Sequence, residues 1–194
     1  MNSAQTNKVG HIFVVSGPSG VGKTVLCNYI VDKYSPKVVY SISTTSRAPR
    51  GGEKDGQEYN FCSSAQFEAE IKEDAFAEWA CVHGNYYGTP RKFLMDNVKA
   101  GRDVVLNIDV QGGMKIHKEY PEAVMIFILP PSFEELENRI RGRNTDSEEA
   151  LQKRMVNARK EIECSKNYEH CLVNDNLDEA KTAIENIFLK YMNC

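Results

Sequence analysis

The sequence predicts an α/β domain built on a parallel sheet that is covered by helices on both faces. Apolar runs of strand length alternate with segments of helical periodicity, an order typical of such a sheet. A glycine-rich stretch also lies between the first predicted strand and the first predicted helix. The length of 194 residues is enough for one domain with a well-formed core and too short for two ordinary ones. We therefore expect one domain over residues 1–194.

The individual elements follow from periodicity. Five apolar runs are expected as strands, at residues 11–16, 38–42, 103–108, 124–129 and 171–173. Phe133, Leu136 and Ile140 form a helical stripe, and Ser132 and Glu135 have the spacing of a capping box at its start. Similar stripes predict helices over residues 151–162 and 180–191. All of these stripes are interpreted as core contacts.

Two segments depart from the alternation. Residues 59–88 show short strand patterns around one helix, which predicts a small inserted subdomain of mixed α/β structure. Residues 141–148, RGRNTDSE, contain no apolar side chain and join two predicted helices. A polar, arginine-bearing connector of this kind is expected to be mobile and to be able to close over a site.

Composition excludes several classes of protein. Hydrophobic residues at 41% and charged residues at 26% are typical of a soluble globular chain and not of a disordered or fibrous one. A formal charge of −3 gives no basic field for nucleic acid, so no nucleic-acid partner is expected. The sequence has neither an apolar run of membrane-spanning length nor a secretory signal, so we expect a cytoplasmic location and no membrane association.

Six cysteines lie scattered along the chain without a CxxC pair or zinc-ligand spacing. We interpret them as mostly buried thiols of a reducing compartment, in preference to disulfides or metal ligands. They are Cys27, Cys62, Cys81, Cys164, Cys171 and Cys194.

The strongest functional signal is a stretch that satisfies G-x-x-x-x-G-K-[ST] between a strand and a helix. Its glycines let backbone amides point at phosphate oxygens, and the helix start adds its positive end. Lys23 can reach the β- and γ-phosphates, and the Thr24 hydroxyl can ligate Mg²⁺. The alternative is a glycine-rich surface turn, which the flanking strand and helix disfavour. The stretch comprises Gly17, Pro18, Ser19, Gly20, Val21, Gly22, Lys23 and Thr24.

A second candidate is Asp109, at the carboxyl end of the strand predicted over 103–108. Ligands of open parallel sheets collect at this edge, where an aspartate can reach a magnesium-bound water or a substrate donor. The alternative is a helix cap for the turn at Gln111.

A third candidate is the loop STTSRAPRGGE, in which Arg47 and Arg50 form a possible clamp for a second phosphate. The alternative is solvated surface charge.

Five motifs together resemble the guanylate kinase family of P-loop nucleoside monophosphate kinases. They are GPSGVGKT, STTSRAPRGGEKDGQEYNF, EWACVHGNYYGTP, NIDVQGG and PPSFEELENRIRGRNTDSEE. They occur in the family's order, and the resemblance extends from about Ile12 to the C-terminus. It implies a core over about 9–42, 90–138 and 156–194, a GMP-binding region over about 43–89 and a lid over about 139–155.

The resemblance also implies roles for single residues. The GMP phosphate would be held by Arg47, Arg50 and Tyr59, with Glu53 and Tyr87 nearby. The guanine base would be contacted by Ser43, Glu78 and Thr89, and Asp109 would lie between base and phosphates. The transferred phosphoryl group would be neutralised by Lys23, Arg47, Arg139, Arg143 and Arg154. Asn174 matches the family's adenine side.

Two positions differ from the family's usual pattern. Asn107 stands where an acidic residue is common, which weakens any expectation that two carboxylates share the metal environment. Ser46 stands where threonine is usual, and it keeps a hydroxyl.

These features predict an ATP:GMP phosphotransferase that uses Mg²⁺ with ATP, accepts GMP, with dGMP as a further candidate acceptor, and works as a monomer or homodimer. Phosphoryl transfer requires mainly positioning and positive charge, so none of the four histidines is needed as a catalyst. The alternative is a non-catalytic guanylate kinase-like scaffold domain that binds phosphorylated peptides, and intact Lys23, Thr24 and Asp109 argue against it. A switch GTPase would need an N-K-x-D motif, which the sequence lacks.

Overall fold

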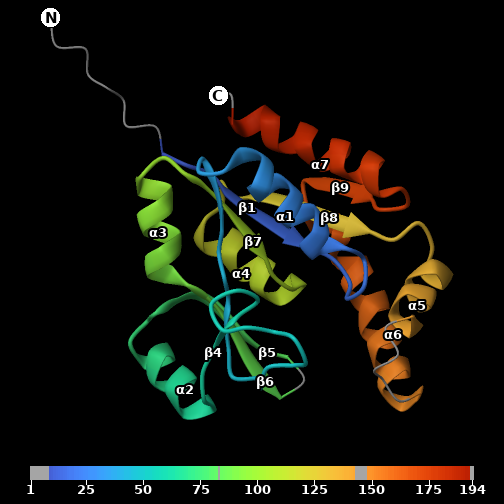
Figure 1. Cartoon of the computed structure of the whole chain (residues 1–194), viewed down its shortest axis with the longest axis horizontal. Helices are drawn as coiled ribbons and strands as arrows, with labels where there is room; N and C mark the ends of the chain where they lie inside the picture. The colour runs from blue at the N-terminus through green and yellow to red at the C-terminus, as the bar shows by residue number, and fades with distance from the viewer. Residues whose placement is uncertain (1–8, 83, 143–147, 193–194) are drawn as a thin grey trace, which may run out of the picture.

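Five parallel strands form the central sheet of the molecule (Figure 1). The computed structural model describes residues 9–82, 84–142 and 148–192. The strands run in the order β2-β7-β1-β8-β9, and each neighbouring pair is parallel. This confirms the predicted sheet, with strand ends within two residues of those expected. The strands are β1 (Ile12–Ser16), β2 (Val38–Tyr40), β7 (Asp103–Asn107), β8 (Val124–Leu129) and β9 (His170–Val173).

Helices cover both faces of this sheet, as the sequence predicts. Side chains alternate along a strand, so β1 sends Phe13 and Val15 to one face and Val14 to the other. Phe13 stacks on Phe188 with ring centroids 3.9 Å apart, whereas Val14 belongs to the second core cluster with Ile116. The first face is covered by α1 (Lys23–Tyr34) and α7 (Leu177–Met192), and the second by α3 (Arg91–Lys99) and α4 (Val110–Glu119).

The inserted region forms a second, mixed sheet beside the core. Its strands have the order β4-β3-β6-β5, with β3 and β4 parallel and the other pairs antiparallel. Phe67, fully buried on the single helix α2, stacks on Phe76 with centroids 4.3 Å apart and so ties the helix to the sheet. The elements are β3 (Thr44–Thr45), β4 (Asn60–Phe61), α2 (Ser64–Lys72), β5 (Phe76–Val82) and β6 (Asn85–Pro90).

The helix pair α5 (Phe133–Arg141) and α6 (Glu148–Glu163) extends from the core on the same lower side as the second sheet in Figure 1. The Ser132 hydroxyl accepts from the Glu135 amide at 3.0 Å, whereas the Glu135 carboxylate pairs with Arg139 at 2.8 Å. Only the serine half of the predicted capping box is therefore present. A short 3₁₀ turn, η1 (Cys164–Asn167), links α6 to β9. The predicted lid boundary near residue 155 falls inside the continuous helix α6.

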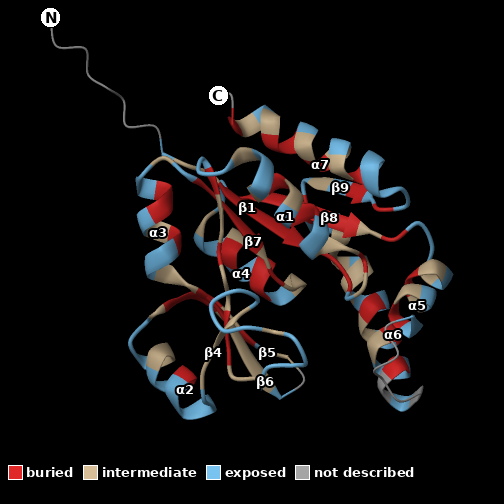
Figure 2. Cartoon of the chain, in the orientation of Figure 1, coloured by how far each residue is buried: buried red, intermediate tan, exposed pale blue. Residues whose placement is uncertain are grey.

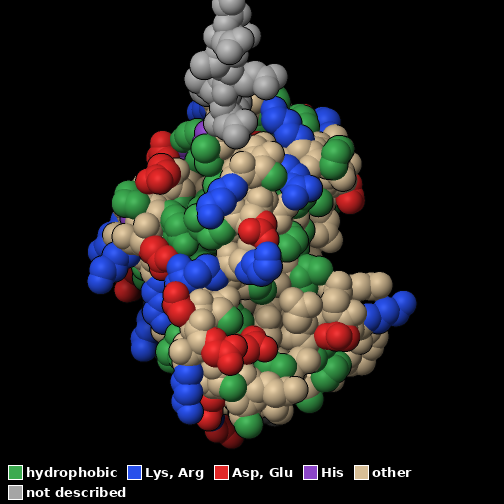
Figure 3. Space-filling view, turned by 90° about the vertical axis from the view of Figure 1, so that its left-hand side faces the viewer, with side chains coloured by type: hydrophobic (Ala, Val, Ile, Leu, Met, Phe, Trp, Pro, Cys, Tyr) green, Lys and Arg blue, Asp and Glu red, His purple; other side chains and the backbone are tan. Residues whose placement is uncertain are grey.

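Burial is concentrated in β1, β7 and β8 (Figure 2). Among the five described cysteines, which are all free thiols, only Cys27 is buried. The expectation of mostly buried thiols is therefore wrong, because most of them lie in helix ends and edge strands and not in the core. No described helix is long and apolar enough to cross a membrane. Figure 3 shows Lys and Arg interspersed with Asp and Glu on the face that it presents.

Candidate functional site

The phosphate loop connects β1 to α1 and depends on three glycines with positive φ. Gly17, Gly20 and Gly22 have φ values of 148°, 91° and 97°. A Cβ on Gly17 would lie 2.4 Å from the Ile128 carbonyl oxygen, and one on Gly22 would lie 2.4 Å from Asn174 Nδ2. Other residues would be strained or would clash there. The loop has the compact, glycine-dependent form in which backbone amides surround an anion.

The Lys23 side chain folds back over this loop. Its Nζ donates to the carbonyl oxygens of Gly17 at 2.5 Å and Pro18 at 3.1 Å. The ammonium group therefore lies at the mouth of the loop, at the start of α1. A bound phosphate would find this positive charge next to the helix N-terminus.

Asn174, at the end of β9, supports the loop from behind. Its Nδ2 donates to the Val21 carbonyl at 2.8 Å, and the residue is 7% exposed. Its own carbonyl accepts from Arg139 Nη1 at 2.8 Å. The structure thus places Asn174 against the phosphate loop, with Arg139 attached to it.

The predicted lid arginines occupy different positions. Arg154, on α6, donates from Nη2 to the Ser19 hydroxyl at 2.7 Å and so reaches the phosphate loop directly. Arg139, in the last turn of α5, is bonded to Asn174 and paired with Glu135. Arg143 lies outside the described residues.

Thr24 contacts the neighbouring strand β7 through a neutral amide. Asn107 Nδ2 donates to Thr24 Oγ1 at 3.2 Å and to the Tyr40 hydroxyl at 3.1 Å. Burial raises the pKa of Tyr40, which keeps its hydroxyl protonated. Within the described part of the chain, no group of three or more His, Cys, Asp or Glu could hold a metal. Tyr40 carries no motif signal, so the sequence did not indicate it as a site residue.

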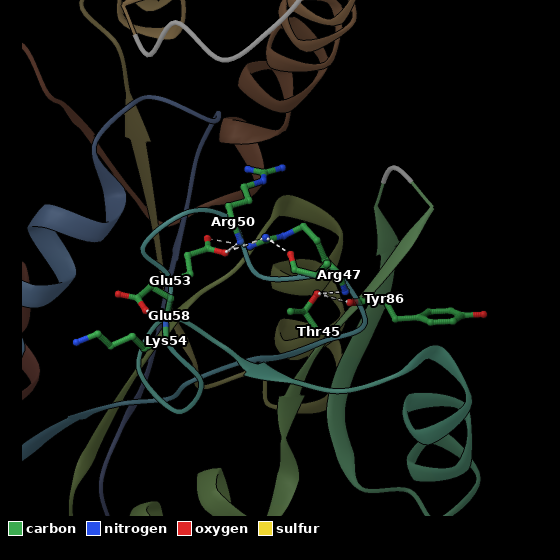
Figure 4. Close-up of polar contacts among 8 residues, drawn as sticks. Thr45, Arg47, Arg50, Glu53, Lys54, Glu58 and Tyr86 are labelled. Carbon is green, nitrogen blue, oxygen red and sulfur yellow. Dashed lines mark hydrogen bonds and ion pairs between the residues drawn. The ribbon is translucent and has the colours of Figure 1, made fainter.

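Arg47 and Glu53 form a two-pronged ion pair in the loop between β3 and β4 (Figure 4). Their nitrogen and oxygen atoms lie 2.9 and 3.0 Å apart, and the Glu53 carboxylate also accepts from the Arg50 amide at 2.7 Å. The Arg47 hydrogen bonds hold the pKa of Glu53 below its usual value. The Arg50 side chain points away from this pair and is exposed.

Aromatic side chains complete this cluster. The Arg47 guanidinium lies 5.3 Å from the Tyr59 ring centroid, and the Tyr59 and Tyr87 rings meet edge to face at 5.8 Å. The structure therefore brings together four of the predicted phosphate-side residues. Ser43 is near this cluster in sequence, and its carbonyl accepts from the Asn60 amide at 2.9 Å.

The predicted base-side residues Glu78 and Thr89 are direct cross-strand neighbours on β5 and β6. The Thr89 hydroxyl donates to Glu78 Oε1 at 2.7 Å, and the two residues are 6% and 0% exposed. Burial raises the pKa of Glu78 to about 7, while the Thr89 hydrogen bond opposes this shift and the charge of Asp109 adds to it. Such a buried carboxylate would be able to accept hydrogen bonds from a ligand that reaches it.

Asp109 lies between the phosphate loop and the Glu78–Thr89 pair. Its Oδ1 caps α4 by accepting from the amides of Gln111 at 2.7 Å and Gly112 at 3.0 Å, so the helix-cap interpretation is correct. Its backbone carbonyl accepts from Ser16, the residue before the phosphate loop, at 3.4 Å. Its charge also acts on Glu78. The cap does not use Oδ2, so a ligand role remains compatible with this geometry.

Two further residues near the site were missed by the sequence argument. Gly112 has no room for a side chain, because a Cβ would lie 2.7 Å from Glu78 Oε2. A pair of glycines in the first turn of a helix was the available signal, since glycine is costly there. Glu161 lies on α6, seven residues after Arg154, and burial raises its pKa while the charge of Lys23 opposes the shift. Its helical spacing from Arg154 could have indicated it.

Comparisons with known proteins agree on one family. The profile of the family described as Guanylate kinase matches residues 10–191. The chain is 47% identical to a guanylate kinase of Caldanaerobacter subterraneus subsp. tengcongensis, over 94% of this chain and 88% of the relative. It is 48% identical to a guanylate kinase of Syntrophotalea carbinolica, over 93% and 85% of the two chains.

A solved structure shows the same similarity in three dimensions. The crystal structure of guanylate kinase from Anaplasma phagocytophilum has a TM-score of 0.76 and 35% identity, covering 94% of this chain and 86% of that one. The profile match and the identities over nearly full length agree with the phosphate loop and the second sheet described above. This chain therefore belongs to the guanylate kinase family.

Proposed function

We propose that this chain transfers the γ-phosphoryl group of ATP to GMP, giving ADP and GDP. The observation that carries the proposal is the position of Asp109, between a phosphate loop on the parallel sheet and a buried Glu78–Thr89 pair on the second sheet. A donor phosphate could thus bind on one side of Asp109 and an acceptor base on the other. The membership in the guanylate kinase family supports the same reaction.

The roles divide between donor and acceptor. The ATP phosphates would be held by Gly17–Thr24 of the loop, with Asn174 on the adenine side. The GMP phosphate would be held by Arg47, Arg50 and Tyr59, with Glu53 and Tyr87 at its edge. The base would be bound by Ser43, Glu78, Thr89 and Asp109. dGMP, which has the same base, is a further candidate acceptor.

Guanine specificity follows from the chemistry of Glu78. Guanine offers two adjacent donors, N1–H and the exocyclic amine, and one carboxylate can accept both. Adenine presents an acceptor at N1, which would face the negative charge. A buried acceptor left unpaired costs about 1–3 kcal/mol or more, so the wrong base is rejected.

Mg²⁺ would bind at the Thr24 hydroxyl. The residues fit this ion, because Mg²⁺ usually takes few protein ligands and completes its shell with phosphate oxygens and water. The ion supplies positive charge to the phosphates when bound. Asn107, which contacts Thr24 Oγ1, would orient that hydroxyl as a neutral group.

The chain's own Lys and Arg side chains would supply the remaining positive charge. Phosphoryl transfer needs alignment of two anionic substrates and positive charge on the shared oxygens. Lys23 would supply that charge from the loop, Arg47 from the acceptor side, and Arg139, Arg143 and Arg154 from the lid. Arg47 would have to exchange Glu53 for the GMP phosphate, because its two prongs are occupied by that carboxylate.

We propose a cytoplasmic enzyme, since the five described cysteines are free thiols, as a reducing compartment requires. A monomer or a homodimer would each serve the reaction, because the site described above uses residues of one chain.

An acceptor panel tests the proposed reaction. Purified protein with Mg²⁺ and ATP is assayed for ADP formation with GMP, dGMP, AMP, UMP or CMP. We expect turnover with GMP and dGMP, and a loss of at least about 100-fold in Lys23→Met with its fold intact, because a charge aimed at the transferring phosphoryl group is lost. Binding of a phosphorylated peptide without any turnover would favour the scaffold alternative.

A further inference from the structure

Helix α4 of the core contacts the edge strand β5 of the second sheet beside the predicted base site. Lys115 Nζ donates to the Trp79 carbonyl oxygen and lies 5.0 Å from the Trp79 ring centroid. Trp79 directly follows Glu78 in β5. An edge strand has carbonyl groups that no neighbouring strand satisfies, and Lys115 satisfies one of them from another part of the fold.

The same helix touches Glu78 one turn earlier. Gly112 and Lys115 are three residues apart and so share a face of α4. Gly112 approaches the Glu78 carboxylate so closely that a Cβ would lie 2.7 Å from Oε2. The backbone of α4 therefore lies against the carboxylate, and the Lys115 side chain lies against the next residue of the strand.

A cavity of about 530 Å³, here called the α4–β5 cavity, is lined by residues of both elements. Its walls include Glu78, Trp79, Lys115, Lys118 and Arg91. Arg91 is bound to Asp74 and Glu119, which neutralise it. Lys118 is exposed. Arg91 and Lys115 both donate to carbonyl oxygens of β5, Arg91 to that of Phe76 and Lys115 to that of Trp79, the residue next to Glu78.

Groups on β6 and at α4 act on Glu78. Thr89 on β6 donates a hydrogen bond, Asp109 at the start of α4 adds negative charge, and Lys115 on α4 adds positive charge. Asp109 favours the protonated form of Glu78, and Lys115 favours the ionised form. Asp109 and Lys115 thus act in opposite directions on the same carboxylate.

We propose that Lys115 is a positioning residue for the acceptor base, which holds β5 against α4 at Trp79 and keeps the neighbouring Glu78 ionised. The inference rests on the proposed function, in which Glu78 accepts two donors of guanine. A protonated Glu78 would direct its own O–H at one of those donors and bind GMP poorly. Because burial raises the pKa of Glu78 to about 7, a nearby cation changes the ionised fraction at neutral pH.

The test is the pH profile of kcat/KM for GMP between pH 5.5 and 9, with saturating ATP and Mg²⁺. Lys115→Met removes the charge and the hydrogen bond, Lys115→Gln keeps a donor without charge, and Lys115→Arg keeps the charge. We expect the acidic limb of the Met and Gln variants to move up by about 0.5 pH unit, which lowers kcat/KM about threefold at pH 6. The Arg variant should follow the wild type.

Lys118→Met is the matched control, since Lys118 lies on the same helix and lines the same cavity. Its profile should coincide with that of the wild type, and the Kd for ATP should stay within about twofold in all variants. Superimposable profiles for Lys115→Gln and the wild type, or an equal shift in Lys118→Met, overturn the assignment to Lys115. A wild-type protein inactive on GMP at every pH contradicts the proposed function instead, and would remove the basis of this inference with it.

Discussion

Glu78 combines almost complete burial with a hydrogen bond from Thr89. It is 6% exposed, it accepts from the Thr89 hydroxyl, and its pKa is raised to about 7. Carboxylates whose pKa lies this far from its usual value are common at functional sites, because a bound ligand supplies interactions that the folded protein alone does not. The cost to the folded state and the proposed benefit to base recognition therefore come from the same side chain.

The first prediction concerns recognition. Glu78→Gln has a similar shape but offers an amide, which cannot accept both guanine donors. We expect kcat/KM for GMP to fall about 100-fold or more, and discrimination against AMP to shrink. Steady-state kinetics with both acceptors measure this, and the Kd for ATP is the control. Values at the wild-type level would show that other residues read the base.

The second prediction concerns stability of the same variant. Because the folded-state pKa of Glu78 is raised, its neutral form favours folding at low pH, and this stability is lost as pH rises through about 7. Glutamine does not titrate. The unfolding free energy of Glu78→Gln minus that of the wild type should therefore be higher at pH 8 than at pH 5, by about 2–3 kcal/mol.

Urea unfolding of the ligand-free proteins at the two pH values measures this difference. Thr89→Ser, which keeps the hydroxyl, is the control and should show no comparable pH-dependent gain. A constant difference between Glu78→Gln and the wild type would mean that Glu78 is ionised in the folded protein throughout this range.

Helix α6 contacts the phosphate loop through one face. Arg154 reaches the Ser19 hydroxyl at 2.7 Å, and Ala158, one turn later, is buried at 2% exposure. Glu161 follows on the same face, where the charge of Lys23 acts on it. The spacing of 154, 158 and 161 places a cation, a small contact residue and an anion against one loop.

The third prediction follows from this face. Arg154→Ala should lower kcat by about 10-fold or more with a smaller change in the KM for GMP, because its charge would act on the transferred phosphoryl group. Lys153→Ala is the control, since Lys153 is exposed and paired with Glu149 on α6. An effect confined to KM would place Arg154 in ground-state binding.

The first and last helices of the chain are tied together far from the site. The Glu185 carboxylate on α7 accepts from Tyr29 at 2.8 Å, from Lys33 at 2.7 Å and from Tyr34, all of which belong to α1. These bonds, with that of Lys33 first, lower the pKa of Glu185 to about 2. They join segments about 150 residues apart on one face of the sheet.

The fourth prediction tests this tie. A lowered pKa means that the stabilisation is present above about pH 4.5 and is lost as pH falls towards 2. Glu185→Gln should lower the midpoint of thermal unfolding by about 2–4 °C at pH 7, a modest effect because solvent and salt screen the group. The difference should shrink below pH 4. Glu179→Gln, exposed on the same helix, is the control, and an equal loss in it would contradict the assignment.

The sequence by itself determined the features that depend on short stretches of chain. The apolar runs predicted β1, β7 and β8 within one residue, because strands buried on both faces must be continuously apolar. The phosphate loop was predicted from eight consecutive residues, because its glycines and Lys23 act through local backbone geometry. The family motifs extended the prediction of binding residues to the second sheet.

The tertiary structure decided what depends on contacts between distant segments. No local pattern shows that Glu78 lies beside Thr89, that Gly112 of another helix touches its carboxylate, or that Lys115 binds the next residue. The same holds for Asn174, whose amide supports a loop more than 150 residues earlier. Burial, pKa and hydrogen-bond partners arise only when such segments meet. The residue types expected to bind phosphate were therefore readable from the chain, whereas the environment of Glu78 was set by packing.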